Sequence, residues 1–383
     1  MALFTKMKTN PMKYLFSIVL IAIVTLVQAQ QNDCYLVVGT YSKPKGEGEG
    51  IYVYKFNDLT GTATFINKIE TQNPSYLTFS KNEKFVYAVN QNGSGKPNEA
   101  SAFSFNKQSG QLTFINKQNV QGDGPCYITV DSNNKWLFTA NYSSGSVSAL
   151  PLQQDGSIGE IKQLITHKGS SIVEKRQSEP HAHSCVFTHN EKYLMVTDLG
   201  TDKIHYYPFA ANNDVPLIVD STKYIQSTPG NGPRHMAFSK KKMYIINELS
   251  GTIDLFLQKK KSWFLHSTIS TDSSRKLDKG SADIHLSRDG KFLYVTNRGS
   301  YNTIATYSIN HNGSLNLIQV IPTNGKTPRN FIVTPSNKFV LVANQNSNNI
   351  VIYSRDITTG LLTPTGNEIK VGTPVSLQMI LSN

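Results

Sequence analysis

Apolar and polar positions alternate over residues 233–248 in a way that predicts a β-hairpin. A first strand-like stretch leads to a Ser-Lys-Lys-Lys turn, and a second one ends on Asn247 and Glu248. Because the strands of an antiparallel hairpin return the chain to its starting level, Arg234 and His235 are expected beside Glu248. One end of this hairpin therefore carries charged groups of both signs.

The same pattern recurs about every fifty residues along the chain. In each copy, a first strand that begins near a Pro or Ser is followed by a tight turn and by a second strand that ends on Asn or Asp. The copies cover residues 74–90, 125–141, 180–198, 233–247, 281–297 and 328–344. Four short strands in each such period are typical of a β-propeller blade.

The two ends of the repeating region each contain half of a hairpin. Residues 374–383 supply a first strand with no second strand after it, and residues 34–39 look like a second strand with no first. Joining the halves completes a seventh blade and removes sheet edges that would invite aggregation. The sequence therefore predicts an all-β fold, a seven-bladed β-propeller whose ring is closed by pairing of the N-terminal strand with the C-terminal strand.

Residues 1–29 are expected to be a secretory signal peptide rather than part of the fold. Lys13 precedes an apolar run from Leu15 to Val27, and small residues follow where a signal peptidase would cleave. The run is shorter than the ~20 residues that a membrane-spanning helix needs. We therefore expect an exported protein, periplasmic or secreted, with a single propeller domain over residues 30–383 and no membrane attachment.

The charge balance is basic. The formal net charge of +12 falls by three, to +9, when Lys6, Lys8 and Lys13 leave with the signal peptide, and this balance would suit an anionic partner. The lysine runs 240–242 and 259–261 are interpreted as solvated loops. Since no nucleic-acid motif or basic arm accompanies them, nucleic acid is not an expected partner.

The cysteines argue against a disulfide framework. The chain has three of them, Cys34, Cys126 and Cys185, and they show no metal-ligand spacing. Packing as small apolar residues is their expected role.

Two connections between strands have unusual sequences. The glycine-rich segment 45–50 resembles a phosphate-binding loop, but no helix follows it, so a flexible strand connection is the better interpretation. Residues 156–180 form the one long insertion between repeats and contain Lys175, Arg176 and Gln177. A wall or lid over a pocket and a plain solvent loop are both open interpretations of this insertion.

Side chains able to do chemistry gather at one end of the predicted hairpins. His181 and His183 are two residues apart on a strand and so project to one side. A metal would need further ligands, and Asp198 is the only nearby carboxylate in the pattern, so no metal site is expected. Other blades add Tyr142, Arg234, His235, Glu248, Asp283, His285, Arg298, Arg329 and Gln345 at the same end. A ring would bring all of them around one axis, which favours a shared site over separate salt bridges.

Several motifs resemble those of the lactonase family of seven-bladed propellers. They are Val38-Gly-Thr-Tyr41, Gly124-Pro-Cys-Tyr127, Pro180-His-Ala-His183, Asp198-Leu-Gly-Thr201, Gly232-Pro-Arg-His235, Asn247-Glu-Leu-Ser250, Asn297-Arg-Gly299 and Thr327-Pro-Arg329. That family is typified by bacterial 6-phosphogluconolactonase and is related to the fungal carboxy-muconate lactonising enzyme. The resemblance implies catalytic roles for His181, Arg234, Glu248 and Arg298. The other polar residues at this end that are candidates for substrate binding are His183, His235, Arg329, Tyr142 and Asp283.

These residue types suit the hydrolysis of a lactone. The reaction needs a base to activate water, and either His181 or Glu248, with a pKa raised by burial, would serve. Arg234 or Arg298 would stabilise the oxyanion, and Arg329 would bind an anionic group of the substrate. Since the chain has no Gly-x-Ser-x-Gly motif, direct attack by water is expected, without a cofactor.

The expected substrate is a small sugar lactone, either 6-phosphoglucono-δ-lactone or unphosphorylated gluconolactone, and the expected oligomeric state is a monomer. Export would keep the protein away from a cytosolic sugar phosphate, so the phosphate is left open. Two alternatives remain: a non-catalytic propeller that binds a glycan or a protein, and a muconate-type cycloisomerase. The binding alternative would require exposed aromatic residues near the axis rather than a cluster of Arg, Glu and His.

Overall fold

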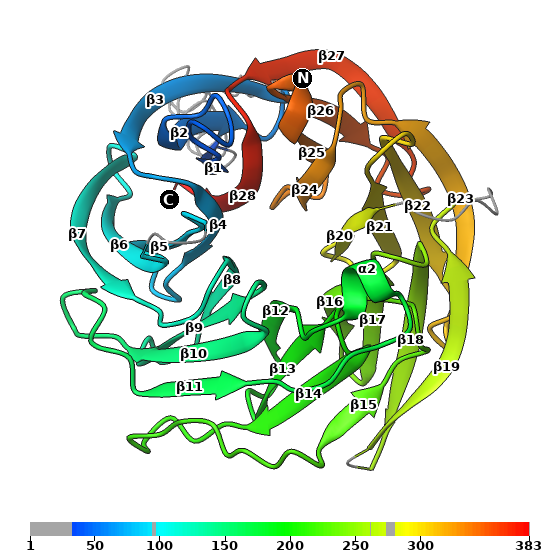
Figure 1. The fold of residues 1–383 in the computed structure, drawn as a ribbon. Helices are drawn as coiled ribbons and strands as arrows, with labels where there is room; N and C mark the ends of the chain where they lie inside the picture. Colours follow the sequence, from blue (N-terminus) through cyan, green and yellow to red (C-terminus); the bar gives the residue numbers. More distant parts are fainter. Residues whose placement is uncertain (1–32, 94–96, 261, 273–279, 383) are drawn as a thin grey trace, which may run out of the picture.

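A computed structural model describes residues 33–93, 97–260, 262–272 and 280–382. Residues 1–29, the expected signal peptide, lie outside these ranges. The described chain forms seven four-stranded antiparallel sheets arranged in a ring, so the predicted all-β, seven-bladed propeller is confirmed (Figure 1). Within the described ranges, no helix is long and apolar enough to cross a membrane.

Six blades are each built from four consecutive strands, of which the first lies nearest the central axis (Figure 1). The first three of these blades are β4 (Pro74–Phe79), β5 (Phe85–Asn90), β6 (Glu99–Asn106) and β7 (Gln111–Asn119); β8 (Pro125–Val130), β9 (Trp136–Asn141), β10 (Ser146–Pro151) and β11 (Gln163–Thr166); and β12 (Ala182–Phe187), β13 (Tyr193–Asp198), β14 (Lys203–Pro208) and β15 (Tyr224–Gln226). The next three are β16 (Pro233–Ser239), β17 (Lys242–Asn247), β18 (Thr252–Lys259) and β19 (Ser262–Ser270); β20 (Ser281–Leu286), β21 (Phe292–Asn297), β22 (Thr303–Ile309) and β23 (Leu315–Pro322); and β24 (Pro328–Val333), β25 (Phe339–Asn344), β26 (Asn349–Arg355) and β27 (Leu362–Lys370). Two short helical turns, α2 (Glu174–Gln177) and η2 (Gln345–Ser347), lie in connections between strands.

The remaining blade closes the ring. Its strands are β28 (Pro374–Leu381), nearest the axis, followed by β1 (Asp33–Thr40), β2 (Gly50–Asn57) and β3 (Thr62–Glu70). The terminal strands β28 and β1 pair antiparallel, with Cys34 opposite Leu381 and Val38 opposite Leu377. The predicted closure by the two ends of the chain is confirmed.

The core lies between neighbouring blades. Every residue of β9 is buried, because both faces of this strand are covered by adjacent sheets, whereas the outer strand β3 has no fully buried residue. Buried tyrosines also join one blade to the next through hydrogen bonds, which satisfy phenols that burial would otherwise leave unpaired. The hydroxyls of Tyr87, Tyr244 and Tyr294 donate to the carbonyl oxygens of Gly156 at 3.1 Å, Gly313 at 2.9 Å and Gly360 at 2.8 Å.

The Asn or Asp that ends each second strand is a structural residue. Nδ2 of Asn90 donates to the carbonyl oxygen of Gln72 at 2.6 Å, and Nδ2 of Asn344 donates to that of Thr323 at 3.0 Å. These carbonyl groups belong to the connection that enters the same blade. The recurring geometry of these two blades at this end is therefore held by buried amide side chains.

A register shift near the start of each axial strand sets the site residues apart from the sheet. In β16, Pro233 pairs with Asn247, but the next paired residue is His235, opposite Ile246. Arg234 is thereby left outside the ladder, as in a β-bulge, which re-aims a side chain. The equivalent unpaired residues of other blades include Cys126, His183 and Arg329.

Candidate active site

Glu248, just after β17, lies at the centre of a cluster of three arginines. Its Oε1 atom is 2.7 Å from Nη2 of Arg176, and its Oε2 atom is 3.0 Å from Nε of Arg234. Nη2 of Arg298 is 2.8 Å from the same Oε2 atom. The Arg234 contact is an ion pair without hydrogen-bond geometry, since this Nε finds no aligned acceptor among the described residues. Three guanidinium groups around one carboxylate leave an excess of positive charge, which suits an anion or an oxyanion.

The pKa of Glu248 lies well below its ordinary value. Burial acts to raise it, but the positive charges of Arg298, Arg234 and Arg176 outweigh the effect of burial. The expected rise in this pKa is therefore wrong, because the expectation took burial without the arginines. A carboxylate held so firmly in its ionised form is a weak general base, and its geometry assigns it to holding the arginines in place.

Arg234 is the most enclosed of these arginines, with 1% of its surface exposed. Its Nη1 atom donates to the carbonyl oxygen of Ala282 and lies 3.3 Å from Nε2 of His235. Burial and the nearby Arg298 lower the pKa of Arg234 to about 10, so the group stays charged at neutral pH.

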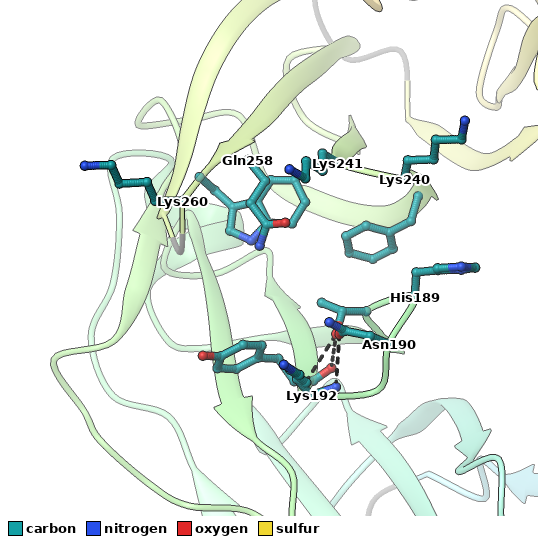
Figure 2. Close-up of a pocket in the computed structure, with 11 residues that line it drawn as sticks. His189, Asn190, Lys192, Lys240, Lys241, Gln258 and Lys260 are labelled. Atoms are coloured by element: carbon teal, nitrogen blue, oxygen red, sulfur yellow. Dashed lines mark hydrogen bonds between the residues drawn. The ribbon is translucent and has the colours of Figure 1, made fainter.

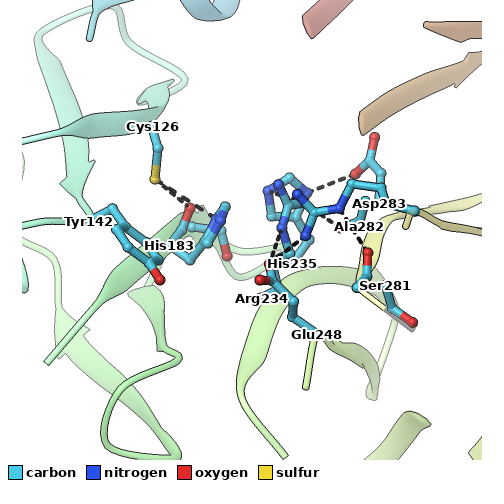
Figure 3. A network of polar contacts seen from close by, with 12 residues as sticks. Cys126, Tyr142, His183, Arg234, His235, Glu248, Ser281, Ala282 and Asp283 are labelled. Carbon is cyan, nitrogen blue, oxygen red and sulfur yellow. Dashed lines mark hydrogen bonds and ion pairs between the residues drawn. The ribbon is translucent and has the colours of Figure 1, made fainter. Parts of the chain in front are cut away.

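His235 links Arg234 to a buried carboxylate (Figure 3). Its Nδ1 atom is 2.7 Å from Oδ1 of Asp283, whose Oδ2 atom is 3.0 Å from Nε2 of His285. Because an ionised carboxylate only accepts, His235 carries a proton on Nδ1 and offers Nε2 as an acceptor to Arg234. Burial and Arg234 lower the pKa of His235 to about 4, which keeps the ring neutral at pH 7. The structure thus places Asp283 behind His235 as a support for it.

His181 is oriented by main-chain atoms and by an aromatic ring. Its backbone N–H donates to Oδ1 of Asp198 at 2.8 Å, and its Nδ1 atom is 2.9 Å from the carbonyl oxygen of Tyr142. The imidazole is stacked on the Tyr142 ring, with centroids 4.3 Å apart and an angle of 4° between the planes. Since a carbonyl oxygen can only accept, the proton of the neutral imidazole is on Nδ1, and Nε2 carries the free lone pair.

His183 is buried deeper than His181. Its Nδ1 atom is 3.8 Å from Sγ of Cys126, and its ring meets those of Tyr142 and His235 edge-on at 5.4 Å and 5.3 Å (Figure 3). Burial, followed by the charge of Arg234, lowers the pKa of His183 well below its usual value. His183 is therefore a neutral part of the site's wall.

The loop before β12 forms a wall of the site, so one of its two open interpretations is confirmed. Nη2 of Arg176, in α2, lies 3.3 Å from the hydroxyl oxygen of Tyr142 as well as 2.7 Å from Glu248. The neighbouring Gln177 is buried, and its Nε2 atom donates to the carbonyl oxygen of Leu199 at 2.8 Å. This buried amide anchors the loop and holds Arg176 over the carboxylate.

A second group of cations lies around Tyr41. The guanidinium of Arg329 and the ammonium of Lys45 are each 5.6 Å from the centroid of the Tyr41 ring. The Tyr41 hydroxyl donates to Oε1 of Gln91 at 2.5 Å, and Lys45 donates to the Gln91 carbonyl oxygen at 2.6 Å. Burial, and then the charge of Arg329, lower the pKa of Lys45. Two cations close enough to repel each other mark a place that an anion would stabilise.

Most of the sequence-predicted residues meet in one cluster. Direct contacts connect Tyr142, His181, His183, Arg234, His235, Glu248, Asp283 and Arg298. Arg329 is close enough to Glu248 for their charges to interact. The sequence placed Arg176 in a loop that was a possible wall of the site but did not single it out, because this insertion has no equivalent in the other repeats. It missed Lys45 and Tyr41 as members of the site, and Lys45 belongs to the glycine-rich connection that carried no helix signal.

The chain belongs to the lactonase family of seven-bladed β-propellers, whose family model, "Lactonase, 7-bladed beta-propeller", matches residues 35–379. It is thus an enzyme of the lactone-hydrolysing class. It is 37% identical over 349 residues to the 6-phosphogluconolactonase of Formosa agariphila, an alignment that covers 90% of this chain and 99% of that one. It is 34% identical over 353 residues to the 6-phosphogluconolactonase of Bacillus subtilis, covering 90% and 97%. The solved periplasmic gluconolactonase of Pseudomonas aeruginosa superposes with a TM-score of 0.87 at 33% identity, covering 92% of this chain and 100% of that chain.

Proposed function

We propose that the protein hydrolyses a sugar lactone to its open acid by direct attack of water. The observation that carries this proposal is the imidazole of His181, whose Nδ1 atom faces the carbonyl oxygen of Tyr142 so that Nε2 carries the lone pair. The Tyr142 ring on which it stacks is connected through Arg176 to Glu248 and its three arginines. Together these groups provide a base, and positive charge in excess of the one carboxylate.

The proposed mechanism gives each group a separate role, and His181 acts first as a base and then as an acid. Nε2 of His181 accepts a proton from water as the water oxygen bonds to the lactone carbonyl carbon. Arg234 and Arg298 stabilise the negative charge that develops on the carbonyl oxygen. When the ring C–O bond breaks, the imidazolium returns the proton to the departing alkoxide, and the product leaves as a hydroxy acid. Glu248 takes no proton in this sequence; it fixes the arginines.

The substrate we propose is 6-phosphoglucono-δ-lactone, with unphosphorylated gluconolactone as the second candidate. The pair formed by Arg329 and Lys45 supports a phosphate group, because neither cation forms an ion pair with a carboxylate in the part of the chain that the structure describes. The relatives named 6-phosphogluconolactonase agree with this choice. The periplasmic gluconolactonase is the precedent for the unphosphorylated substrate and for the export that we propose for this chain.

The test is a comparison of the two lactones on the purified protein, with the spontaneous opening in buffer subtracted. We expect Arg234→Ala and Glu248→Gln to lose most of the rate while remaining folded by circular dichroism. Lys240→Ala, a change in the β16–β17 turn at the opposite end of the hairpin, is the matched control and should keep the wild-type rate. Equal rates for the wild type and both site variants would exclude this site as the catalytic one.

One further surface bears on the binding alternative. A groove of about 380 Å³ lies at the turns of two neighbouring blades, at the end of the strands away from Glu248 (Figure 2). It contains the aromatic residues Tyr193, Phe238 and Trp263 with lysines around them. An aromatic surface of the kind that glycan binding would use therefore exists away from the arginine cluster. In the cluster, Tyr41 and Tyr142 are already in contact with Arg329 and His181, and the cluster itself combines Arg, Glu and His, as the enzyme requires.

A further inference from the structure

Three side chains of the kinds that bind metal ions meet beneath the loop that carries Arg176. His167 follows β11, Asp198 ends β13, and His205 lies in β14, so two blades contribute. One ligand atom from each residue lies within 4.8 Å of the other two. The sequence pattern placed Asp198 near His181 and His183 and predicted no metal site there, whereas the Oδ2 atom of Asp198 faces these two other histidines.

His205 has a polar atom that the protein itself does not satisfy. Its Nε2 atom is buried and has no hydrogen-bond partner among the described residues. The nearest carboxylate atom, Oδ2 of Asp198, is 3.9 Å away, which is too long for a hydrogen bond. A buried nitrogen without a partner is costly, and a bound ion would remove that cost.

The other two residues are held as metal ligands usually are, by an outer layer of hydrogen bonds. Oδ1 of Asp198 accepts from the backbone N–H groups of His181, Gly200 and Thr201 at 2.8, 3.0 and 3.1 Å, and so leaves Oδ2 facing the histidines. Nε2 of His167 is 3.0 Å from the hydroxyl oxygen of Tyr207, while its Nδ1 is 2.7 Å from Oδ2 of Asp198.

We propose that His167, Asp198 and His205 form a binding site for Zn²⁺, with Nδ1, Oδ2 and Nε2 as the respective ligand atoms. Ligand atoms around a tetrahedral zinc ion are about 3.3 Å apart for bonds of ~2.0–2.1 Å. The two measured separations, 2.7 Å and 3.9 Å, lie on either side of that value, so small opposite shifts would admit the ion. Two imidazoles and one carboxylate are a ligand set that zinc accepts, and a water molecule would be the fourth ligand.

The protons rearrange without net loss. In the metal-free protein, Nδ1–H of His167 donates to Asp198 and the Tyr207 hydroxyl donates to Nε2. With zinc on Nδ1, the proton of the neutral imidazole resides on Nε2 and is donated to the Tyr207 oxygen. The ammonium of Lys203 is turned toward the Tyr224 ring, 4.6 Å from its centroid.

Zinc at this place would join the base of the loop to the blade beside it. Asp198 would then bind the ion through one oxygen and the backbone of His181 through the other. The ion would therefore act as a structural tie, separate from the groups that contact substrate.

The test is zinc binding by the full-length protein after chelator treatment and dialysis. Titration calorimetry with ZnCl₂ should show one equivalent bound, and zinc should raise the melting temperature, whereas MgCl₂ should do neither. His205→Ala should lower zinc affinity by roughly 100-fold or more, and Tyr207→Phe by about 10–100-fold, the usual effect of losing an outer partner. His266→Ala, which removes an exposed histidine of β19, is the matched control and should bind zinc as the wild type does.

Two results would overturn the proposal. One is a wild type that binds no more zinc than His205→Ala does at equal protein concentration. The other is a His266→Ala variant that loses binding as His205→Ala does, which would indicate scattered surface sites. If His205→Ala proved unstable without metal, His205→Gln, which keeps the size and polarity of the side chain, would give the same comparison in a folded protein.

Discussion

The carbonyl oxygen of Tyr142 lies 2.9 Å from Nδ1 of His181, and this contact decides which ring nitrogen is available to act as the proposed base. Because this carbonyl belongs to the main chain, the tautomer does not depend on which side chain stands at position 142. The stacked Tyr142 ring then sets the plane of the imidazole. The position of the proposed base's lone pair is thus set by the backbone and the side chain of one residue, Tyr142, which belongs to the blade before that of His181.

Replacing the proposed base should reduce turnover. We expect His181→Ala to lower kcat for lactone opening about 10²–10⁴-fold, the usual contribution of a positioned base, with a smaller change in KM. Initial rates at pH 7 would show this. Tyr142→Phe keeps the carbonyl and the stacked ring, so it should retain most of kcat. Wild-type turnover in His181→Ala would place the base elsewhere.

Adding a side chain to a glycine near the site should lower activity, because the backbone of a neighbouring segment lies against it. A Cβ atom on Gly200 would lie 1.9 Å from the carbonyl oxygen of Glu179, so Gly200→Ala must displace the chain that leads into His181. We expect a lower melting temperature and a kcat reduced at least about tenfold, since small misplacements of catalytic groups are costly. Gly366→Asn is a suitable control, because nothing lies within 4 Å of that position and Asn tolerates its φ of 83°. Unchanged kcat in Gly200→Ala would show that this close approach does not position His181.

The cations around Tyr41 should discriminate between the two substrates. Under the proposed function, Lys45→Ala and Arg329→Ala should raise KM for 6-phosphoglucono-δ-lactone by about 10–100-fold, the loss expected for a hydrogen bond to a charged group. KM for unphosphorylated gluconolactone should change by much less. Steady-state kinetics with both lactones would test this, and equal effects on both would assign these residues to the sugar rather than to phosphate.

Acid should destabilise the fold through its buried neutral histidines. The pKa of His235 is lowered by burial and by Arg234 from 6.5 to about 4, so the unfolded chain binds a proton more readily than the folded one. The stability from the neutral ring is present above pH 6.5 and is lost as the pH falls toward 4, by up to about 1.4 kcal/mol per pH unit. His183 acts in the same direction.

Urea unfolding at pH 7 and pH 5 would measure this loss. His235→Gln, which cannot titrate, should show a smaller drop in the free energy of unfolding between the two pH values than the wild type. The comparison of the two drops matters, because the substitution itself also changes stability at pH 7. Equal drops would mean that His235 is not a source of the acid sensitivity.

The sequence predicted the architecture well because a propeller repeats its pattern. Pro233 to Glu248 contain the information for one blade, and the halves at the two ends of the chain could be joined by the same period. Residues on the repeat, such as Arg234 and Arg298, were placed correctly at one end of the ring for this reason.

The sequence could not predict contacts between segments that are not related by the repeat. Arg176 lies in an insertion, so no period placed it against Glu248. The pKa of Glu248 depends on three arginines from separate segments, and burial alone pointed in the wrong direction. Likewise, His167 and His205 have no motif that relates them to Asp198; their proximity arises only from the packing of two blades.

The place of β28 has a consequence for folding. It pairs with β1, with Cys34 opposite Leu381, so one sheet joins segments that are very far apart in sequence. Bringing such distant segments together costs loop-closure entropy, and pairings of this kind form slowly. Until β28 is added, one flank of β1 is an unpaired sheet edge that is open to pairing with another molecule, so closure of the ring is the folding step most exposed to aggregation.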